Sequence, residues 1–103
     1  MAHSSTKRRL RSEINKYENL KEEIKEIIHS LNGSVSDMND GVDRIRNEYV
    51  IDNEDAVITT SINALKGEVS KTSNYLNNKV LPEIRSIIKD LKDELRRLEE
   101  EDD

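Results

Sequence analysis

Two residues of this sequence are spaced as metal ligands are in some helical bundles. Glu26 and His29 are three positions apart, so both would project from one face of a helix, as the Glu-x-x-His pairs of di-iron bundles do. Such a site also needs further inward-facing glutamates and a second histidine. The only other histidine is His3, close to the N-terminus. We therefore expect neither a metal nor a cofactor, and we interpret Glu26 as part of a solvated face.

The remaining reactive side chains form no catalytic pattern. The chain has no cysteine, only two histidines and three glycines, so neither a nucleophile with its base nor a glycine-rich phosphate loop is indicated. The basic cluster Lys7, Arg8, Arg9 and Arg11 could contact phosphate, but no aromatic residue is interleaved with it and the net charge is −5. We expect no catalytic residue, no enzymatic activity and no nucleic-acid partner.

The composition is typical of long helices. Of 103 residues, 33% are hydrophobic and 38% are charged, and the chain contains one proline and neither Phe nor Trp. This leaves little material for a globular core, so the chain is expected to need a partner. The predicted fold class is all-α, as a single domain over 1–103.

Apolar residues recur every three or four positions in both halves of the chain, which predicts two amphipathic helices that pack as in a coiled coil. We expect a long antiparallel hairpin with helices over about 5–50 and 55–99 and a turn at about 51–54, where Asp52 or Asn53 can cap the second helix. The residues predicted to form the seam of the hairpin are Leu31, Val35, Met38, Val42, Ile45, Tyr49, Ile58, Ile62, Leu65 and Val69.

A second turn is conceivable at 29–43, because Leu31-Asn32-Gly33 resembles a helix stop and Ser34 a helix start. A turn there would make a three-helix protein. The apolar series keeps its register on both sides of Gly33 and Gly41, and two interior glycines cost only roughly 1 kcal/mol each. We favour a continuous or kinked first helix.

A turn near residue 53 would place residue i roughly opposite residue 106 minus i. The weak helix formers of 30–36 would then face those of 70–76. The basic segment 7–11 would face the acidic segment 95–101, where opposite charges attract. Pro82 is expected to kink the second helix or to mark the start of a new one.

One region holds more apolar residues than a two-helix seam requires, and exposed apolar patches mark association sites. Either this wide stripe closes the hairpin's own core, or it meets a helical partner and completes a four-helix bundle with it. Leu20, Ile27, Leu81 and Ile88 are the residues expected to meet that partner. The predicted protein-binding residues are Leu20, Ile24, Ile27, Ile28, Val80, Leu81, Ile84, Ile87 and Ile88.

No apolar run approaches the roughly 18 residues that a membrane span requires, and no apolar segment follows the basic start, as it would in a signal peptide. We expect no membrane span. The expected location is the cytoplasm, or export together with the partner by a route that needs no signal peptide.

A cysteine-free chain of about a hundred residues with two amphipathic helices and a mid-chain turn resembles the small helical-hairpin proteins of type VII secretion, the Trp-x-Gly (WXG) group. Leu31-Asn32-Gly33 shares only the glycine of that motif, and the chain has no tryptophan. The resemblance is therefore to the tryptophan-less partner proteins of LXG toxins. It implies a non-enzymatic targeting or chaperone-like protein that binds the helical N-terminal domain of a secreted toxin, or another small helical protein. The alternative is a structural coiled-coil subunit or spacer that forms a homodimer.

Overall fold

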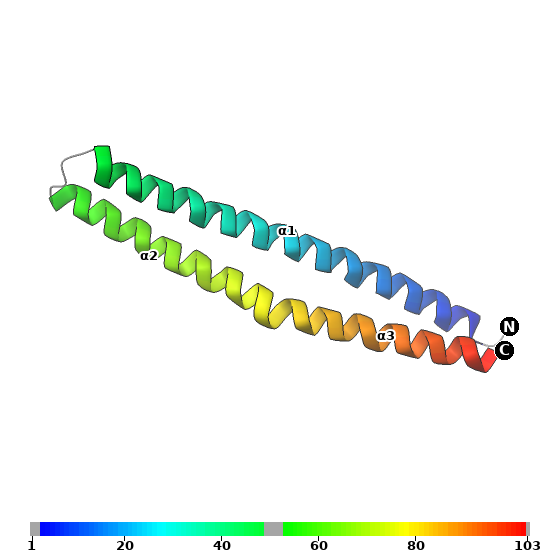
Figure 1. The fold of residues 1–103 in the computed structure, drawn as a ribbon. Helices are drawn as coiled ribbons and strands as arrows, with labels where there is room; N and C mark the ends of the chain where they lie inside the picture. Colours follow the sequence, from blue (N-terminus) through cyan, green and yellow to red (C-terminus); the bar gives the residue numbers. More distant parts are fainter. Residues whose placement is uncertain (1–2, 49–52, 103) are drawn as a thin grey trace. The chain divides into compact units, whose positions relative to one another are not determined.

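The computed structural model describes residues 3–48 and 53–102, and all regular structure in them is helical (Figure 1). Helix α1 runs over Ser4–Glu48 and α2 over Asn53–Tyr75. A short π-helix, η1, follows at Leu76–Val80, and α3 runs over Leu81–Asp102. The protein is an all-α helical hairpin, as the apolar periodicity predicted.

The predicted boundaries agree with the structure to within a few residues. Of the turn predicted at 51–54, residues 51 and 52 lie outside the described residues, whereas Asn53 and Glu54 already belong to α2. Tyr49 of the predicted seam also lies outside them. The second helix differs more from the prediction, because η1 interrupts it.

Helix α1 continues without a break through 29–43, so the three-helix alternative is wrong. Neither Gly33 nor Gly41 has a positive φ, and an added Cβ at either position would meet no atom within 4 Å. The hydroxyl of Ser34 donates a hydrogen bond to the carbonyl oxygen of Ser30, at 3.1 Å, within this stretch. Weak helix formers are tolerated here because the apolar residues around them continue to pack.

The π-helix is explained by the residue that follows it. Pro82 is the second residue of α3, and it has no N–H to bond the carbonyl of Asn78. Its ring would also clash with that carbonyl in a regular α-helix. The wider turn of η1 removes this clash. Asn77 and Asn78 are poor helix formers, so departing from regular α-helix geometry costs little there. Pro82 thus marks a change of helix type rather than a simple kink.

Contacts within the chain gather into two compact units. Unit 1 comprises Met1–Lys25 with Asn77–Asp103, and unit 2 comprises Glu26–Leu76. The single domain predicted over 1–103 stays a prediction.

Unit 1 pairs the first part of α1 with α3 around an apolar core. The predicted meeting of basic and acidic ends is confirmed here: Arg11 donates a hydrogen bond to Glu99 at 3.1 Å, and His3 lies 3.5 Å from Glu101. Arg11 contacts a residue about one helical turn beyond the predicted partner. The buried apolar side chains of this core are Leu10, Ile14, Ile24, Leu81, Ile84, Ile88 and Leu98.

Unit 2 pairs the rest of α1 with α2 and buries much less. Among its described side chains only Val42 and Ser73 are buried, with 4% exposure each. Ser73 donates a hydrogen bond to Asn32 at 2.7 Å, so the two weak helical stretches face each other as predicted. Unit 2 therefore has little of the buried apolar contact that holds most helical hairpins together.

Candidate protein-binding surfaces

Four of the nine predicted protein-binding residues belong to the core of unit 1 and not to an outer surface. Ile24, Leu81, Ile84 and Ile88 are each at most 8% exposed. For these four, the prediction of a partner surface is corrected: the wide apolar stripe closes the hairpin's own core. The reason is that both helices of unit 1 carry a broad apolar face, and two broad faces can cover each other.

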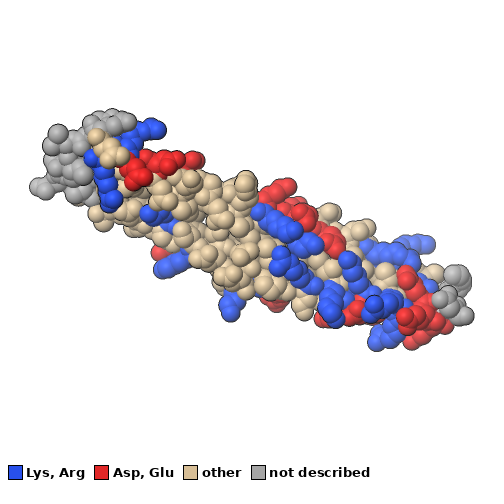
Figure 2. Space-filling view, viewed as in Figure 1, with Lys and Arg blue, Asp and Glu red and all other residues tan. Residues whose placement is uncertain are grey.

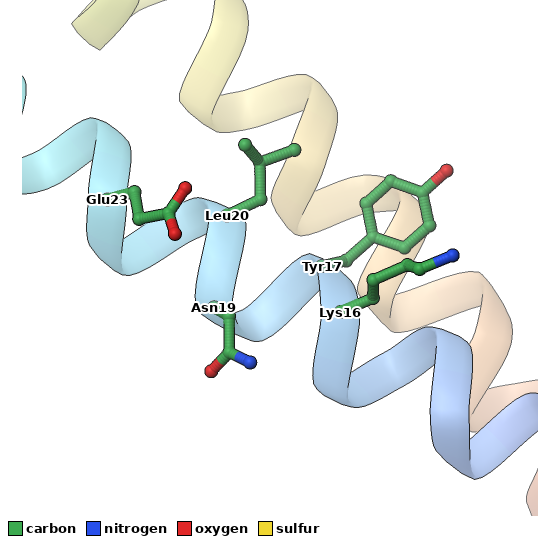
Figure 3. A pocket seen from close by; sticks show the side chains of 5 residues that line it. All are labelled: Lys16, Tyr17, Asn19, Leu20 and Glu23. Carbon is green, nitrogen blue, oxygen red and sulfur yellow. The ribbon is translucent and has the colours of Figure 1, made fainter.

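Leu20 is the most exposed of the predicted binding residues of unit 1. It is 39% exposed, and it lines an open depression of about 470 Å³ together with Lys16, Tyr17, Asn19 and Glu23. Figure 3 shows the Tyr17 ring and Leu20 on the same side of α1, with Asn19 pointing away from them. All five residues come from α1. The depression thus combines an apolar centre with a charged rim.

The other predicted binding residues are either exposed or half-buried. Ile27, on the part of α1 that belongs to unit 2, is 48% exposed. Ile28 in unit 2 is half-buried, as are Val80 and Ile87 in unit 1. Leu20 and Ile27 are therefore the two members of the set that offer large apolar surface to a partner.

Unit 2 also exposes residues that were predicted to lie inside its seam. Ile58 is 48% exposed and Leu65 is 58% exposed, so both are corrected to surface positions. Beside them, Val57 is 65% exposed. The described seam residues that remain between the helices are buried or half-buried: Leu31, Val35, Met38, Val42, Ile45, Ile62 and Val69.

Two hydrogen bonds between polar residues join α1 and α2 across unit 2. The ammonium of Lys66 donates to Asn39 at 2.8 Å, and Ser73 donates to Asn32. The two residues on each helix are seven positions apart, so they recur on one side of it. Lys66 follows Leu65 directly, which is a rotation of about 100° around the helix. This polar pairing, made by Asn32, Asn39, Lys66 and Ser73, lies on the side of α2 that meets α1, and Leu65 lies about 100° around the helix from Lys66.

Sequence reasoning missed this arrangement because it assigned every large apolar residue to the seam. The signal that could have revealed it is the matching seven-residue spacing of the two asparagines and of Lys66 and Ser73. In Figure 2 the face of unit 2 that is visible is largely tan, whereas blue and red atoms crowd over unit 1. No charged residue occurs from 56 to 65, so the exposed residues Val57, Ile58 and Leu65 lie in a part of α2 that is poor in charge.

A charged hollow in unit 1 is organised by two carboxylates. Glu18 lies 2.9 Å from Lys21 and 3.1 Å from Lys92, and the hydrogen bonds from these ammonium groups lower the pKa of Glu18. Asp93 lies 3.0 Å from Lys89 and 2.9 Å from Arg96. The hydrogen bond from Lys89 lowers the pKa of Asp93, and the same contact raises that of Lys89. Of these contacts, the ion pair between Glu18 and Lys92 links α1 to α3.

The residues considered first for metal chemistry lie on the surface. Glu26 and His29 are both exposed, and among the described residues no group of three or more His, Cys, Asp or Glu side chains could hold a metal ion. Within the same residues, no helix has the length and apolar character needed to cross a lipid bilayer.

Comparison with known proteins gives no family assignment: no protein-family model, no curated protein and no solved structure matches the chain.

Proposed function

We propose that this chain is a non-enzymatic protein-binding module that packs its exposed apolar residues against helices of another protein. Leu20 carries the proposal. It is a large aliphatic side chain that an otherwise well-packed unit leaves in an open depression beside Tyr17. Single exposed leucines are common, but this one has an aromatic neighbour, and Lys16 and Glu23 form a charged rim. An apolar centre within a polar rim is the usual anatomy of a protein interface.

The surface area of the chain also supports a partner. A compact monomer of 11.9 kDa exposes roughly 6,000 Å², whereas this chain exposes 7593 Å². The excess of roughly 1,600 Å² is about twice the 800 Å² that each partner contributes to a standard interface. Binding one or two further helices would bring the exposed area to the level of an ordinary domain.

The kind of partner follows from the resemblance of the sequence to type VII secretion hairpins. We propose that the partner is the helical N-terminal domain of an LXG-type toxin, which this chain would accompany to the secretion machinery as a targeting or chaperone-like protein. The all-α hairpin supports this proposal, because a hairpin with exposed apolar residues can complete a bundle with further helices.

Co-expression with the helical N-terminal domain of an LXG toxin would test the proposal. We expect a stable complex on size exclusion, and we expect Leu20→Asp and Ile27→Asp each to weaken it at least about tenfold, because burying a charge opposes association. Asn15→Asp is the matched control: it adds the same charge at an exposed position on the opposite side of α1 from Leu20.

Two results would contradict the proposal. If no complex forms with the toxin domain, the partner is wrong. If a complex forms but Leu20→Asp and Ile27→Asp bind as well as Asn15→Asp does, the surface is wrong. Circular dichroism of each variant confirms that the helices remain, which is expected because all three residues are exposed.

A further inference from the structure

The charged hollow of unit 1 is lined mainly by cations. It is an open hollow of about 380 Å³, and all its lining residues belong to unit 1. Besides the buried side chain of Ile88 and the carboxylates of Glu18 and Asp93, five basic side chains line it: Lys21, Arg85, Lys89, Lys92 and Arg96. The hollow thus holds three more positive than negative charges, in a chain whose net charge is −5.

The basic residues of α3 gather on the side of the hollow. Of the five that occur from 83 to 97, all but Arg97 line it. Of the four acidic residues in the same stretch, only Asp93 lines it. At about 100° per residue, the four cations fall within an arc of about 60° of the helix. Such a concentration is unfavourable by itself, because like charges three or four positions apart on a helix repel.

The contacts within the hollow offset this repulsion only in part. Each of the two carboxylates lies within 3.1 Å of two of the cations. An ammonium group has three N–H donors and a guanidinium group has five, so these four cations keep donors for a ligand. Arg85 is exposed and forms no hydrogen bond or ion pair with any other described residue. The surplus of positive charge is therefore available to an anion.

We propose that the charged hollow binds an oligophosphate, a ligand of two or three linked phosphate groups, through Arg85, Lys89 and Lys92. A single carboxylate would neutralise one of the three surplus charges, whereas an oligophosphate carries several charges in a compact volume. Guanidinium groups bind phosphate oxygens in pairs, and ammonium groups act as point charges. Neighbouring cations on α3 are three or four positions apart, about 5–6 Å between Cβ atoms, so successive side chains can reach one ligand.

The surroundings of the hollow favour a compact anion over a long one. Glu99, Glu100 and Glu101 follow Arg96 on α3, and Glu99 is paired with Arg11 at 3.1 Å. A nucleic acid or an anionic membrane that extended along α3 would meet these like charges. A ligand of two or three phosphate groups can stay within the hollow and avoid them.

This inference goes beyond the proposed function, because it concerns another side of the protein. Glu18 and Leu20 are two positions apart on α1, so they lie about 160° apart around the helix. None of the residues that line the depression at Leu20 lines the charged hollow. The chain can therefore hold an oligophosphate and a protein partner at the same time.

Isothermal titration calorimetry of the purified chain with inorganic tripolyphosphate tests the proposal. We expect one ligand per chain, and we expect Arg85→Gln to raise the dissociation constant at least about fivefold, because a charge-assisted contact is lost. Arg97→Gln is the matched control, since it removes the same charge from an exposed position of the same helix outside the hollow. It should change the dissociation constant less than about twofold, because solvent screens a distant charge. No binding by the wild type, or an equal effect of both substitutions, would overturn the proposal.

A comparison of anions at equal ionic strength identifies the class of ligand. Inorganic phosphate should bind at least about tenfold more weakly than tripolyphosphate, because it brings fewer charges to the cations. A glutamate-rich peptide and a short DNA duplex are the other two probes. If either binds more tightly than tripolyphosphate and loses affinity in Arg85→Gln, the hollow is a site for an acidic protein segment or for nucleic acid, and the proposal is wrong.

Nuclear magnetic resonance locates the ligand without any substitution. Addition of tripolyphosphate should shift the backbone amide signals of Lys21 and of 85–96, and it should leave those of 31–45 in unit 2 unchanged. Shifts spread evenly over both units would contradict a single site.

The two proposals fail separately. Arg85→Gln should capture the toxin domain as well as the wild type does, and loss of tripolyphosphate binding with unchanged capture supports both proposals. A chain that captures the toxin domain but binds no tripolyphosphate sinks only the oligophosphate site. A chain that binds tripolyphosphate through Arg85 but ignores the toxin domain sinks only the proposed function.

Discussion

At the scale of single residues, the contacts of Glu18 help to join the two helices of unit 1. Its carboxylate accepts from Lys21 on its own helix and from Lys92 on α3. Ion pairs at a surface contribute little each, and this one is partly exposed. The ion pair nevertheless makes the free energy of unfolding depend on pH, because the Glu18 carboxyl binds a proton with different affinity in the folded and the unfolded state.

We predict that the free energy of unfolding falls on acidification partly through Glu18. The pKa of this carboxyl is lowered in the folded protein, chiefly by the hydrogen bond from Lys21 and then by that from Lys92. Its contribution is therefore fully present above the unfolded pKa of roughly 4.3 and is lost as the pH falls through the lower folded pKa. Urea unfolding between roughly pH 6 and pH 3 should show a smaller loss for Glu18→Gln than for the wild type. The same change at exposed Glu100 should leave the wild-type slope, and an equal effect of both changes would refute the role of Glu18.

At the scale of elements, α1 shows how far packing tolerates poor local propensity. Two glycines and several small polar residues occupy 29–43, yet the helix is continuous. Leu31, Val35, Met38 and Val42 keep apolar contact on the seam side throughout. Most helical stability in proteins comes from such a packed face rather than from propensity.

The glycines of α1 should therefore be replaceable. Neither Gly33 nor Gly41 needs a conformation that alanine cannot adopt, and both have room for a Cβ. We expect Gly33→Ala and Gly41→Ala each to raise the free energy of unfolding by roughly 0.8 to 1 kcal/mol, and the pair to be additive because about 12 Å separates them. Chemical denaturation measures this.

Gly67→Ala in α2 offers a comparison in the other helix of unit 2, since that glycine has equal room. A loss of stability on Gly33→Ala would mean that the glycine permits a close approach that the isolated chain does not show. Toxin-domain capture by the doubly substituted chain would then reveal whether a partner backbone needs that space.

At the scale of the whole molecule, buried apolar residues are distributed unequally. Seven of the eight buried apolar side chains in the described part of the chain belong to unit 1, and only Val42 belongs to unit 2. Because burial of apolar area is the main favourable term in folding, unit 2 has the smaller reserve of stability. Regions with few buried contacts open locally before the rest of a protein unfolds.

We predict that unit 2 opens first in hydrogen exchange. Amides of 10–24 and 84–98 should exchange more slowly than those of 31–45 and 59–73. Ile84→Ala should cost about 2 to 5 kcal/mol, because it removes a core side chain, and it should speed exchange in unit 1. Equal protection of both units would show that the hairpin unfolds as one body.

The sequence alone determined the helices of the described residues, the pairing of the first half of the chain with the second, and the meeting of residues 7–11 with 95–101. These follow from local and additive signals: apolar spacing, the absence of breakers and the balance of charge along each half. It also predicted that apolar surface exceeds what one seam can cover. Leu20 and Ile27 carry part of that excess.

Only the tertiary structure decided which residues are covered. Ile24, Leu81, Ile84 and Ile88 are core because two broad apolar faces meet in unit 1. Ile58 and Leu65 are on the surface of unit 2, where Lys66 and Ser73 instead make hydrogen bonds to α1. A heptad pattern specifies that an apolar stripe exists but leaves its rotation toward the neighbouring helix open. That rotation depends on pairs of side chains from both helices, which no single helix sequence contains.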